Sequence, residues 1–501
     1  MITNREQRAK FNIFFTLIGQ VITLVCGLVV PSLMIRAFGS EAYGATTSIT
    51  QFLAYITLLE GGIGGVARAA LYKPLAENDN KTISKVVREI QCFFRIIAVI
   101  FLVYVLILAC SFKSISRVQS FDWLSTFFLV IVISISTVAQ YFIGISYQVL
   151  IQAAQRTYIT QIISSVATIL NTILIVILVM LGGNLITVKL VSSLIFALRP
   201  FIQYLYVKKE FNLEKTKERD KKILEQKWTG LGQHIAFFLH SNTDVAVLTV
   251  MANLTYVAIY SVYYMVVSNI QNLTTSFLSG MEALFGDMLA RNEIKQLCRV
   301  FDIYEAVISL VAGVLFSVTA VMIIPFIKLY TAGINDVNYI HPLFGLLLVI
   351  SSYFYCLRMP YHSVTIAAGH FKQTKLAAYG EAAMNIVLSI ILVNKYNIIG
   401  VAVATVIAVI FRTVYYVLYL SKNIFYRKID IFIKRTVCNV FSFSIIVFIG
   451  NKIVQLVNIV NYQRWFFCSI IVFAWATVVQ IIVFRIFYRE IYKAVIIKIK
   501  G

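Results

Sequence analysis

Residues 157–188 read TYITQIISSVATILNTILIVILVMLGGNLITV and contain no Asp, Glu, Lys or Arg. A transmembrane helix needs about 20 predominantly apolar residues, so this run is long enough to cross a bilayer. Other uncharged runs cover residues 11–35, 123–155 and 245–281. Inside a bilayer the backbone polar groups must be satisfied within the chain, and a continuous apolar run does this as a helix. The pattern predicts a helical membrane protein, because barrel strands show short alternating segments.

The composition of the 501 residues supports the same prediction, with 60% hydrophobic and 13% charged residues. About 300 apolar side chains exceed what one soluble core buries and supply roughly 14 crossings. A soluble enzyme is therefore excluded. We expect spans near residues 11–34, 45–69, 90–110, 123–148, 158–181, 186–206, 229–250, 254–280, 300–327, 341–366, 376–394, 397–420, 437–458 and 463–485.

The basic residues predict the orientation of these spans, because cytoplasmic loops collect Lys and Arg. With Met1 inside, 32 Lys and Arg fall at the inner side and 8 at the outer side. Both termini are therefore expected in the cytoplasm. The net charge of +22 follows from anchoring to anionic lipid and does not call for a nucleic-acid partner.

The chain also carries an internal repeat. A shift of 213 or 214 residues superposes identical residues over some 190 positions, which isolated apolar coincidences do not do. The matched pairs include Gly19 and Gly232, Gln20 and Gln233, Tyr147 and Tyr361, Asn171 and Asn385, and Arg199 and Arg412. Each copy holds six crossings, so the two lobes are expected to be related by a pseudo-twofold axis along the membrane normal. Such a pair suits a transporter.

The repeat predicts the domain organisation. The N-terminal lobe covers residues 1–206, a basic cytoplasmic linker covers 207–228, and the C-terminal lobe covers 229–420. Residues 421–501 add two further helices and a cytoplasmic tail. The expected fold class is thus an all-α polytopic membrane protein of about 14 transmembrane helices, two six-helix lobes and two extra C-terminal helices.

Basic and amide residues inside the spans indicate a substrate pathway, because ionisable groups at depth are costly unless they face water or a partner. Arg358, two residues before Pro360, is either cavity-facing or paired with a carboxylate. Arg68 follows a glycine-rich segment, which is equally typical of tight helix packing. Arg36 is expected at the outer mouth. Arg95, Arg199 and Arg412 lie nearer the inner ends, where anchoring to lipid head groups is favoured. Gln20 and Gln233 are candidates for neutral lining of the cavity.

Acidic residues inside the spans are candidates for coupling to a cation. Asp244 has His240 one turn before it on the same helical face. Such a pair carries a proton or a metal cation, or is a buried hydrogen-bonding pair with no role in coupling. Glu60 is the second candidate. We expect no bound cofactor, but coupling to H⁺ or Na⁺ is open.

Several chemistries are excluded by their missing motifs. The sequence has no GxxxxGK[ST] phosphate loop, no HExxH and no GxSxG. The seven cysteines are scattered without ligand spacing, so no metal site and no catalytic residue is predicted. The outer loops, mostly under about 15 residues, leave little room for the catalytic domain of a membrane glycosyltransferase or polymerase.

Four segments carry a resemblance to a family. They are RAFGSEAYG at 36–44, LLEGGIGG at 58–65, AAGHFKQT at 367–374 and IIGVAVAT at 398–405. In order and spacing the whole chain resembles bacterial polysaccharide flippases, the Wzx-type members of the multidrug, oligosaccharidyl-lipid and polysaccharide exporter superfamily. Drug antiporters of the same superfamily share the fold that this resemblance implies.

The resemblance implies an inner-membrane protein that moves undecaprenyl-pyrophosphate-linked oligosaccharide to the periplasmic leaflet for O-antigen, capsule or exopolysaccharide. It implies cavity arginines that hold the pyrophosphate, for which Arg36, Arg68 and Arg358 are the local candidates. It also implies membrane lipids and the polymerase and chain-length machinery as partners. The main alternative is a cation-coupled exporter of small drugs or metabolites. Two weaker alternatives are a major facilitator, whose DRxGRR-like loop motif is missing, and a glycan-assembly enzyme.

Overall fold

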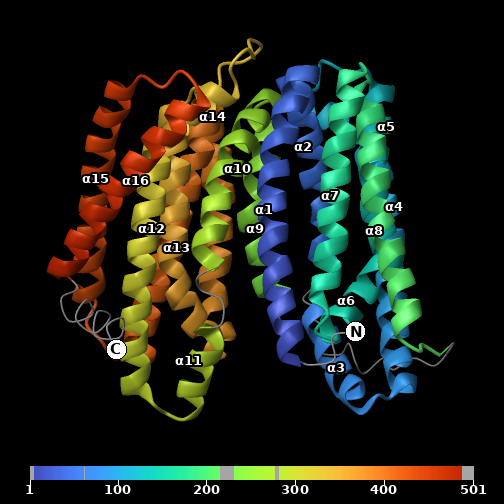
Figure 1. The fold of residues 1–501 in the computed structure, drawn as a ribbon, viewed down its shortest axis with the longest axis horizontal. Helices are drawn as coiled ribbons and strands as arrows, with labels where there is room; N and C mark the ends of the chain where they lie inside the picture. Colours follow the sequence, from blue (N-terminus) through green and yellow to red (C-terminus); the bar gives the residue numbers. More distant parts are fainter. Residues whose placement is uncertain (1–4, 61–62, 215–230, 277–280, 488–501) are drawn as a thin grey trace. The chain divides into compact units, whose positions relative to one another are not determined.

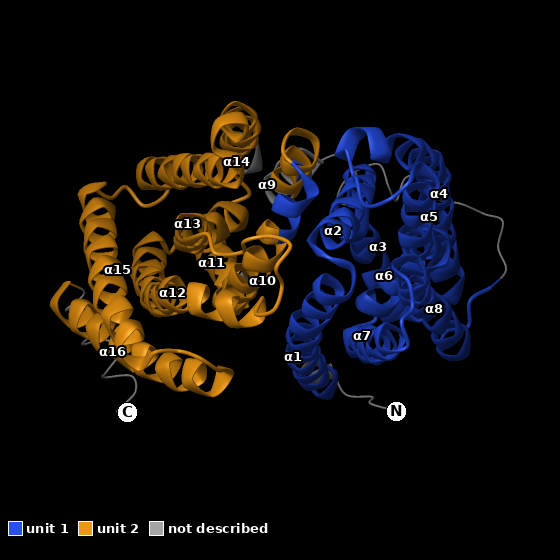
Figure 2. Ribbon diagram, turned by 90° about the horizontal axis from the view of Figure 1, so that it is seen from above, with its two compact units in different colours: residues 1–238, 253–258 blue, residues 239–252, 259–501 orange. Residues whose placement is uncertain are grey.

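The computed structural model describes residues 5–60, 63–214, 231–276 and 281–487. Within these ranges every regular element is a helix, as Figure 1 shows. The predicted all-α class is therefore confirmed. Contacts divide the chain into two compact units, coloured separately in Figure 2: unit 1 holds residues 1–238 and 253–258, and unit 2 holds 239–252 and 259–501.

Unit 1 is a bundle of long helices joined by short turns. Its elements are α1 (Arg5–Phe38), α2 (Ser40–Ala54), η1 (Tyr55–Glu60), α3 (Ile63–Glu77), α4 (Asn80–Ser116), α5 (Trp123–Ala139), η2 (Gln140–Gly144), α6 (Ile145–Ala153), α7 (Thr157–Met180) and α8 (Leu185–Glu210). α1 packs against α7, and α5 packs against both α4 and α8. One continuous cluster of buried apolar side chains fills the bundle.

Unit 2 is a second bundle of long helices. Its elements are α9 (Leu231–Met251), α10 (Leu254–Ser276), α11 (Met281–Ala290), α12 (Ile294–Tyr330), α13 (Pro342–Ala367), α14 (Phe371–Asn423), α15 (Asp430–Val457) and α16 (Tyr462–Phe487). The division between the units falls inside α9 and near the start of α10. α13 packs along α14, and α12 contacts α13, α15 and α16. The predicted linker, residues 207–228, lies mostly outside the described residues, and the domain boundaries stay a prediction.

The described helices are long and apolar enough for a multi-pass membrane protein. Ten pass as candidate membrane spans, or eleven if α2, η1 and α3 together form one span. α14 has 53 residues, about 80 Å of helix, which is far more than one crossing of about 30 Å. Its backbone leaves helical geometry at Asn397, with φ of 47°, where the predicted span 397–420 begins after the predicted span 376–394. It therefore contains both predicted spans.

The outward faces of the helices are as apolar as a lipid-facing surface requires. α1 is the clearest case: its most apolar 18-residue window is only 6% buried, although its mean hydropathy is 2.5. Exposed Phe14, Val21 and Val25 lie along it. Soluble monomers rarely expose contiguous apolar patches of this kind, and a bilayer covers them.

The helix ends are fixed by short polar side chains outside the predicted spans. At the start of α4, Asp79 accepts hydrogen bonds from the Thr82 hydroxyl and from the Thr82 backbone N–H, 3.0 Å away. These bonds lower the pKa of Asp79. Asp122 caps α5 in the same way through Ser125, and Asn184 caps α8 through Thr187. Each cap satisfies backbone donors that the first turn leaves open.

Candidate functional site

Asp244 in α9 lies at the centre of a buried polar cluster in unit 2. Its carboxylate accepts hydrogen bonds from the Tyr260 hydroxyl (3.0 Å), the Thr405 hydroxyl (3.0 Å) and the Asn385 amide (3.2 Å). These three partners come from α10 and α14 and are all neutral, and Asp244 is only 4% exposed. A carboxylate held this way in a helix bundle is a suitable place for a proton or a small cation.

A second polar cluster in unit 2 is built on Glu381 of α14. Its two carboxylate oxygens pair with Arg358 of α13 at 2.6 Å and with Arg412 of α14 at 2.5 Å. Arg412 also donates to the Tyr416 hydroxyl at 3.2 Å. Glu381 is fully buried, and Arg358 and Arg412 are 3% and 6% exposed. The three charged groups leave one net positive charge in the interior.

The two clusters occupy successive turns of α14. Glu381 and Asn385 are four residues apart, which separates them by about 6 Å along the helix axis. The surplus positive charge of the arginine cluster therefore lies about one turn from the negative charge of Asp244. This proximity lowers the cost of burying both charges.

The structure changes the interpretation of two arginines. We expected Arg412 to anchor in lipid head groups, but this expectation is wrong, because Arg412 is buried on Glu381. For Arg358 the carboxylate partner that we weighed against a cavity-facing position is present. Whether Arg358 also binds substrate stays a prediction.

Unit 1 holds Arg68 and Glu60 in two separate contacts. Arg68 of α3 is half-buried and donates to the Gln152 side chain of α6 at 3.0 Å. Glu60, the last residue of η1, accepts a hydrogen bond from the Tyr141 hydroxyl of η2. Tyr141 is 4% exposed. Both predicted residues thus point to polar groups of the bundle and not to its apolar outer face.

Arg36 and Arg68 lie at opposite ends of unit 1. Arg8, near the start of α1, donates to the Ala154 carbonyl, two residues after Gln152. Arg36 lies 28 residues further along α1, about 42 Å away, and its guanidinium donates to Ser32. The structure therefore does not bring these two arginines together.

Three of the predicted site residues are not seen in either polar cluster of unit 2. Gln20 is exposed on α1. The side chains of Gln233 and His240 lie outside the described residues, although both positions belong to α9. Their roles in cavity lining and cation coupling stay predictions.

Glu381, which pairs with both arginines of the second polar cluster, was not predicted from the sequence. Glu381 is the single charged residue of the predicted span 376–394, so the signal was present. Sequence reasoning also missed a cluster near the start of α12, where Arg427 and Arg435 pair with Asp302 and Glu305. Among the described residues no group of three or more His, Cys, Asp or Glu could hold a metal ion.

Several solved structures have a fold similar to that of this chain. The lipid II flippase MurJ, in an inward closed conformation, is 17% identical with a TM-score of 0.70, over 96% of this chain and all of that chain. An inward-facing multidrug resistance MATE family transporter of the MOP superfamily is 16% identical, with a TM-score of 0.57 over 80% of this chain and 95% of that chain. The MATE multidrug transporter DinF-BH is 15% identical, with a TM-score of 0.57 over 84% of this chain and 97% of that chain.

The fold and the buried polar clusters define a multi-pass, all-helical membrane protein that shares its fold with MurJ and the MATE transporters. The family model of the polysaccharide biosynthesis proteins matches residues 10–285, more than half of the chain. The chain belongs to this family. Among curated proteins, none matches the sequence.

Proposed function

We propose that the protein moves undecaprenyl-pyrophosphate-linked oligosaccharide repeat units from the cytoplasmic to the periplasmic leaflet by alternating access. The translocated repeat units are used for O-antigen, capsule or exopolysaccharide assembly. The observation that supports this most strongly is membership of the polysaccharide biosynthesis family in a chain with the fold of a lipid II flippase. The class is a transporter and not an enzyme.

The arginines of the helix bundles suit the transport of a pyrophosphate-linked glycan. A pyrophosphate with a hydrated glycan does not cross hydrocarbon unaided, because each desolvated charge costs several kcal/mol. A guanidinium removes part of this cost, since its planar fork binds phosphate oxygens bidentately. With the cell interior negative, outward movement of two negative charges is favoured by about 4.6 kcal/mol per 100 mV. Export therefore needs no ATP in principle.

Arg68 is the strongest candidate for holding the pyrophosphate. It is half-buried, its hydrogen-bond partner is the neutral Gln152, and no carboxylate in the described part of the chain forms an ion pair with it. Arg36 is the corresponding candidate at the opposite end of unit 1. The head group meets Arg68 at the cytoplasmic side and Arg36 at the periplasmic side. Arg358 contributes less, because its guanidinium is already paired with the Glu381 carboxylate.

The deciding experiment is deletion of the gene in its native host followed by lipid analysis. We expect undecaprenyl-linked repeat units to accumulate and surface polysaccharide to disappear, and the wild-type gene to reverse both. Arg68→Gln should fail to restore the polysaccharide, whereas Arg299→Gln, an exposed position at the start of α12, should restore it. Normal polysaccharide in the deletion strain excludes the proposal.

Asp244 is the proposed position for coupling to H⁺ or Na⁺, with Glu60 as the second position. The Asp244 carboxylate, the Thr405 hydroxyl and the Asn385 side-chain oxygen, 3.4 Å from that hydroxyl, are the kind of oxygen ligands that a hard cation prefers. Asp244→Asn keeps the shape of the side chain and removes its charge. We expect this variant to lose any stabilisation by sodium or by a shift in pH that the wild-type protein shows in thermal unfolding. Equal responses of both proteins exclude Asp244 as the coupling site.

The proposed location is the bacterial cytoplasmic membrane, with both termini in the cytoplasm. The polymerase and chain-length machinery of polysaccharide assembly are the proposed protein partners. The second candidate function is export of small drugs or metabolites, which the fold shared with MATE transporters favours. In that case the deletion strain would accumulate a fluorescent organic cation and would keep its polysaccharide.

A further inference from the structure

Unit 1 contains a polar cavity between η2, α6, α7 and α8. Its volume is about 340 Å³, within the size range of small-molecule sites. Every lining residue is polar: five are glutamines, three carry hydroxyls, and Arg199 of α8 is the charged one. The cavity lies toward the end of the unit where α6 meets α7, since Gln152 of α6 and Thr157 of α7 both line it.

Two residues of the cavity wall each have a polar group that could bind a ligand. Arg199 donates to the Phe196 carbonyl at 3.3 Å and lies over the Phe196 ring at 4.6 Å, but no described carboxylate forms an ion pair with it. Gln203, one turn further along α8, is 3% exposed, and its side-chain oxygen has no hydrogen-bond partner. A buried acceptor without a partner is costly, and a ligand hydroxyl would satisfy it.

The internal repeat shows what unit 2 places at the same positions. With the shift of 214 residues before the α7–α8 turn and 213 after it, Arg199 corresponds to Arg412 and Gln203 to Tyr416. Ala167 corresponds in the same way to Glu381. In unit 2 these three residues are bonded to one another, because Arg412 pairs with Glu381 and donates to Tyr416. The carboxylate of Glu381 thus neutralises the repeated arginine.

Unit 1 keeps the arginine and lacks both interior carboxylates. Ala167 stands in place of Glu381, and Pro31 stands in place of Asp244. Ala167 is buried on α7, one turn after Ser164, which lines the cavity. Unit 1 therefore offers Arg199 no such carboxylate, and Arg199 borders the space of the polar cavity instead. A guanidinium beside such a space favours an anion, because a partly desolvated charge needs a counter-charge.

The position that corresponds to Arg358 carries no side chain in unit 1. Gly144, at the end of the π-helical segment η2, corresponds to Arg358. A Cβ at Gly144 would lie 2.5 Å from the Gln140 side-chain oxygen and 2.8 Å from Pro200 of α8. No side chain fits there without a shift of its neighbours. Arg199 therefore has no basic neighbour equivalent to Arg358.

We propose that this cavity binds an anionic group that carries hydroxyls, with Arg199 holding the negative charge and the glutamines holding the hydroxyls. The ligand would supply to Arg199 the negative charge that Glu381 supplies to Arg412 in unit 2. Two sources share this chemistry: an acidic sugar, and the phosphoglycerol head group of a lipid. The site goes beyond the proposed function, because it does not depend on which cargo the protein carries.

The test is thermal unfolding of the purified full-length protein with defined probes. Sodium glucuronate should raise the unfolding midpoint, and equal concentrations of glucose or sodium chloride should not. In parallel, nanodiscs of phosphatidylglycerol are compared with nanodiscs of phosphatidylcholine. A response to glucuronate identifies the sugar source, and a response to phosphatidylglycerol alone identifies the head group. No response to either probe overturns the proposal.

Two variants of matched size separate this site from general stability effects. Ala167→Glu supplies an internal carboxylate like that of unit 2, and Ala167→Gln supplies the same bulk without charge. We expect Ala167→Glu to fold and to need at least tenfold more of the active probe for half-maximal stabilisation than Ala167→Gln. Arg199→Gln should show a similar loss. Equal responses of the two Ala167 variants overturn the assignment.

Discussion

Glu381 supplies the negative charge that pairs with the two buried arginines of unit 2. A single fully buried carboxylate holds two buried guanidinium groups, one from α13 and one from the second half of α14. Removing one partner of a buried ion pair costs much more than the pair contributes, because the remaining charge stays desolvated. Here the loss would leave two positive charges without their carboxylate.

Glu381→Gln should therefore lower the free energy of unfolding by about 3–5 kcal/mol, which a thermal or denaturant titration in detergent measures. The matched control is Glu77→Gln, since Glu77 forms an exposed pair with Lys73 and such pairs contribute about 1 kcal/mol or less. Equal unfolding midpoints for the two variants would show that the arginine cluster is not held by Glu381.

The sequence singles out two of the buried charged side chains of unit 2 but does not reveal their partners. Arg358 and Asp244 were identified because charge inside an apolar run is visible in one dimension. Their partners come from other helices: Glu381 lies 23 residues from Arg358, and Asn385 lies 141 residues from Asp244. Hydropathy alone does not reveal such pairings.

At the scale of elements, α15 and α16 are joined to α12 by close helix contacts. Gly450 of α15 packs on Val321 of α12, where a Cβ would lie 2.7 Å from the Val321 side chain. Gln480 of α16 donates to the Ser442 hydroxyl of α15 at 3.1 Å and fills the space beside Gly313 of α12. Small residues at helix contacts are the usual means of close packing in membranes.

Gly450→Ala should destabilise the protein by about 1–3 kcal/mol, because an added methyl group overpacks the contact with α12. Gly286→Ala in α11 is the control, since a Cβ there meets nothing within 4 Å. The control should be neutral or stabilising by up to about 1 kcal/mol, through helix propensity. The measurement is the unfolding midpoint of both variants. A Gly450→Ala protein as stable as the control would contradict close packing of Gly450 on Val321.

Most of the spans were predictable from sequence, although α9 and α10 are not among the candidate spans of the described residues, and helix ends and irregularities were not predictable. α4 and α12 each have 37 residues, well beyond the predicted spans 90–110 and 300–327, because their polar ends stay helical outside the apolar run. The π-helical turn η2 has no hydropathy signal, although it shapes the unit 1 cavity. The boundary inside α14 was predictable because Lys395 and Asn397 interrupt the apolar pattern.

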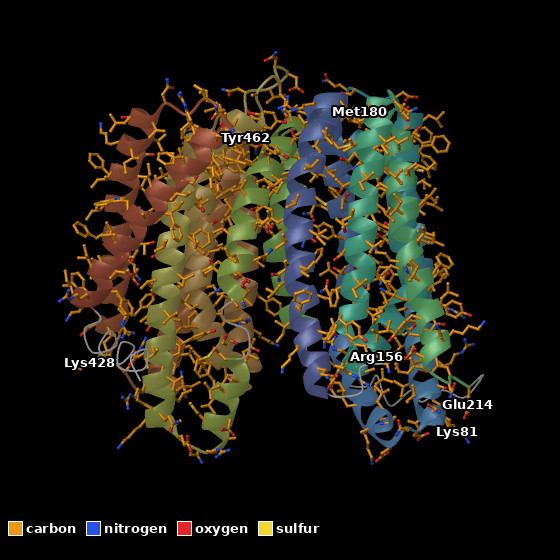
Figure 3. The ribbon with its side chains drawn as sticks, viewed as in Figure 1. Lys81, Arg156, Met180, Glu214, Lys428 and Tyr462 are labelled. Atoms are coloured by element: carbon orange, nitrogen blue, oxygen red, sulfur yellow. The ribbon has the colours of Figure 1, made fainter. Side chains whose placement is uncertain are left out.

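At the scale of the whole molecule, the distribution of basic residues predicts how the chain lies in the membrane. Met180 and Lys81 lie at opposite ends of unit 1 in Figure 3, and Met180 is 81% exposed. In a cysteine-free background, Met180→Cys in intact spheroplasts should react with a membrane-impermeant maleimide. Lys81→Cys should react only after permeabilisation. The reverse pattern would contradict the orientation given by the basic residues.

The internal repeat of the sequence predicts two related bundles, and their interiors carry different charged residues. Unit 2 is neutralised from within by Asp244 and Glu381, whereas unit 1 has Pro31 and Ala167 at these positions. The repeat and its spacing were visible in the sequence. The chemical difference between the copies was not, because it appears only when the contacts of Arg412 are compared with those of Arg199.

The central claim is that the protein itself moves a lipid-linked oligosaccharide across a bilayer. The most direct measurement uses purified protein in liposomes that contain undecaprenyl-pyrophosphate-linked oligosaccharide from the host on both leaflets. A membrane-impermeant glycosidase is added outside. We predict cleavage of nearly all of the lipid with the wild-type protein, and of about half in protein-free vesicles or with Arg68→Gln. Cleavage of half with the wild-type protein, in vesicles shown to contain folded protein, would contradict the claim.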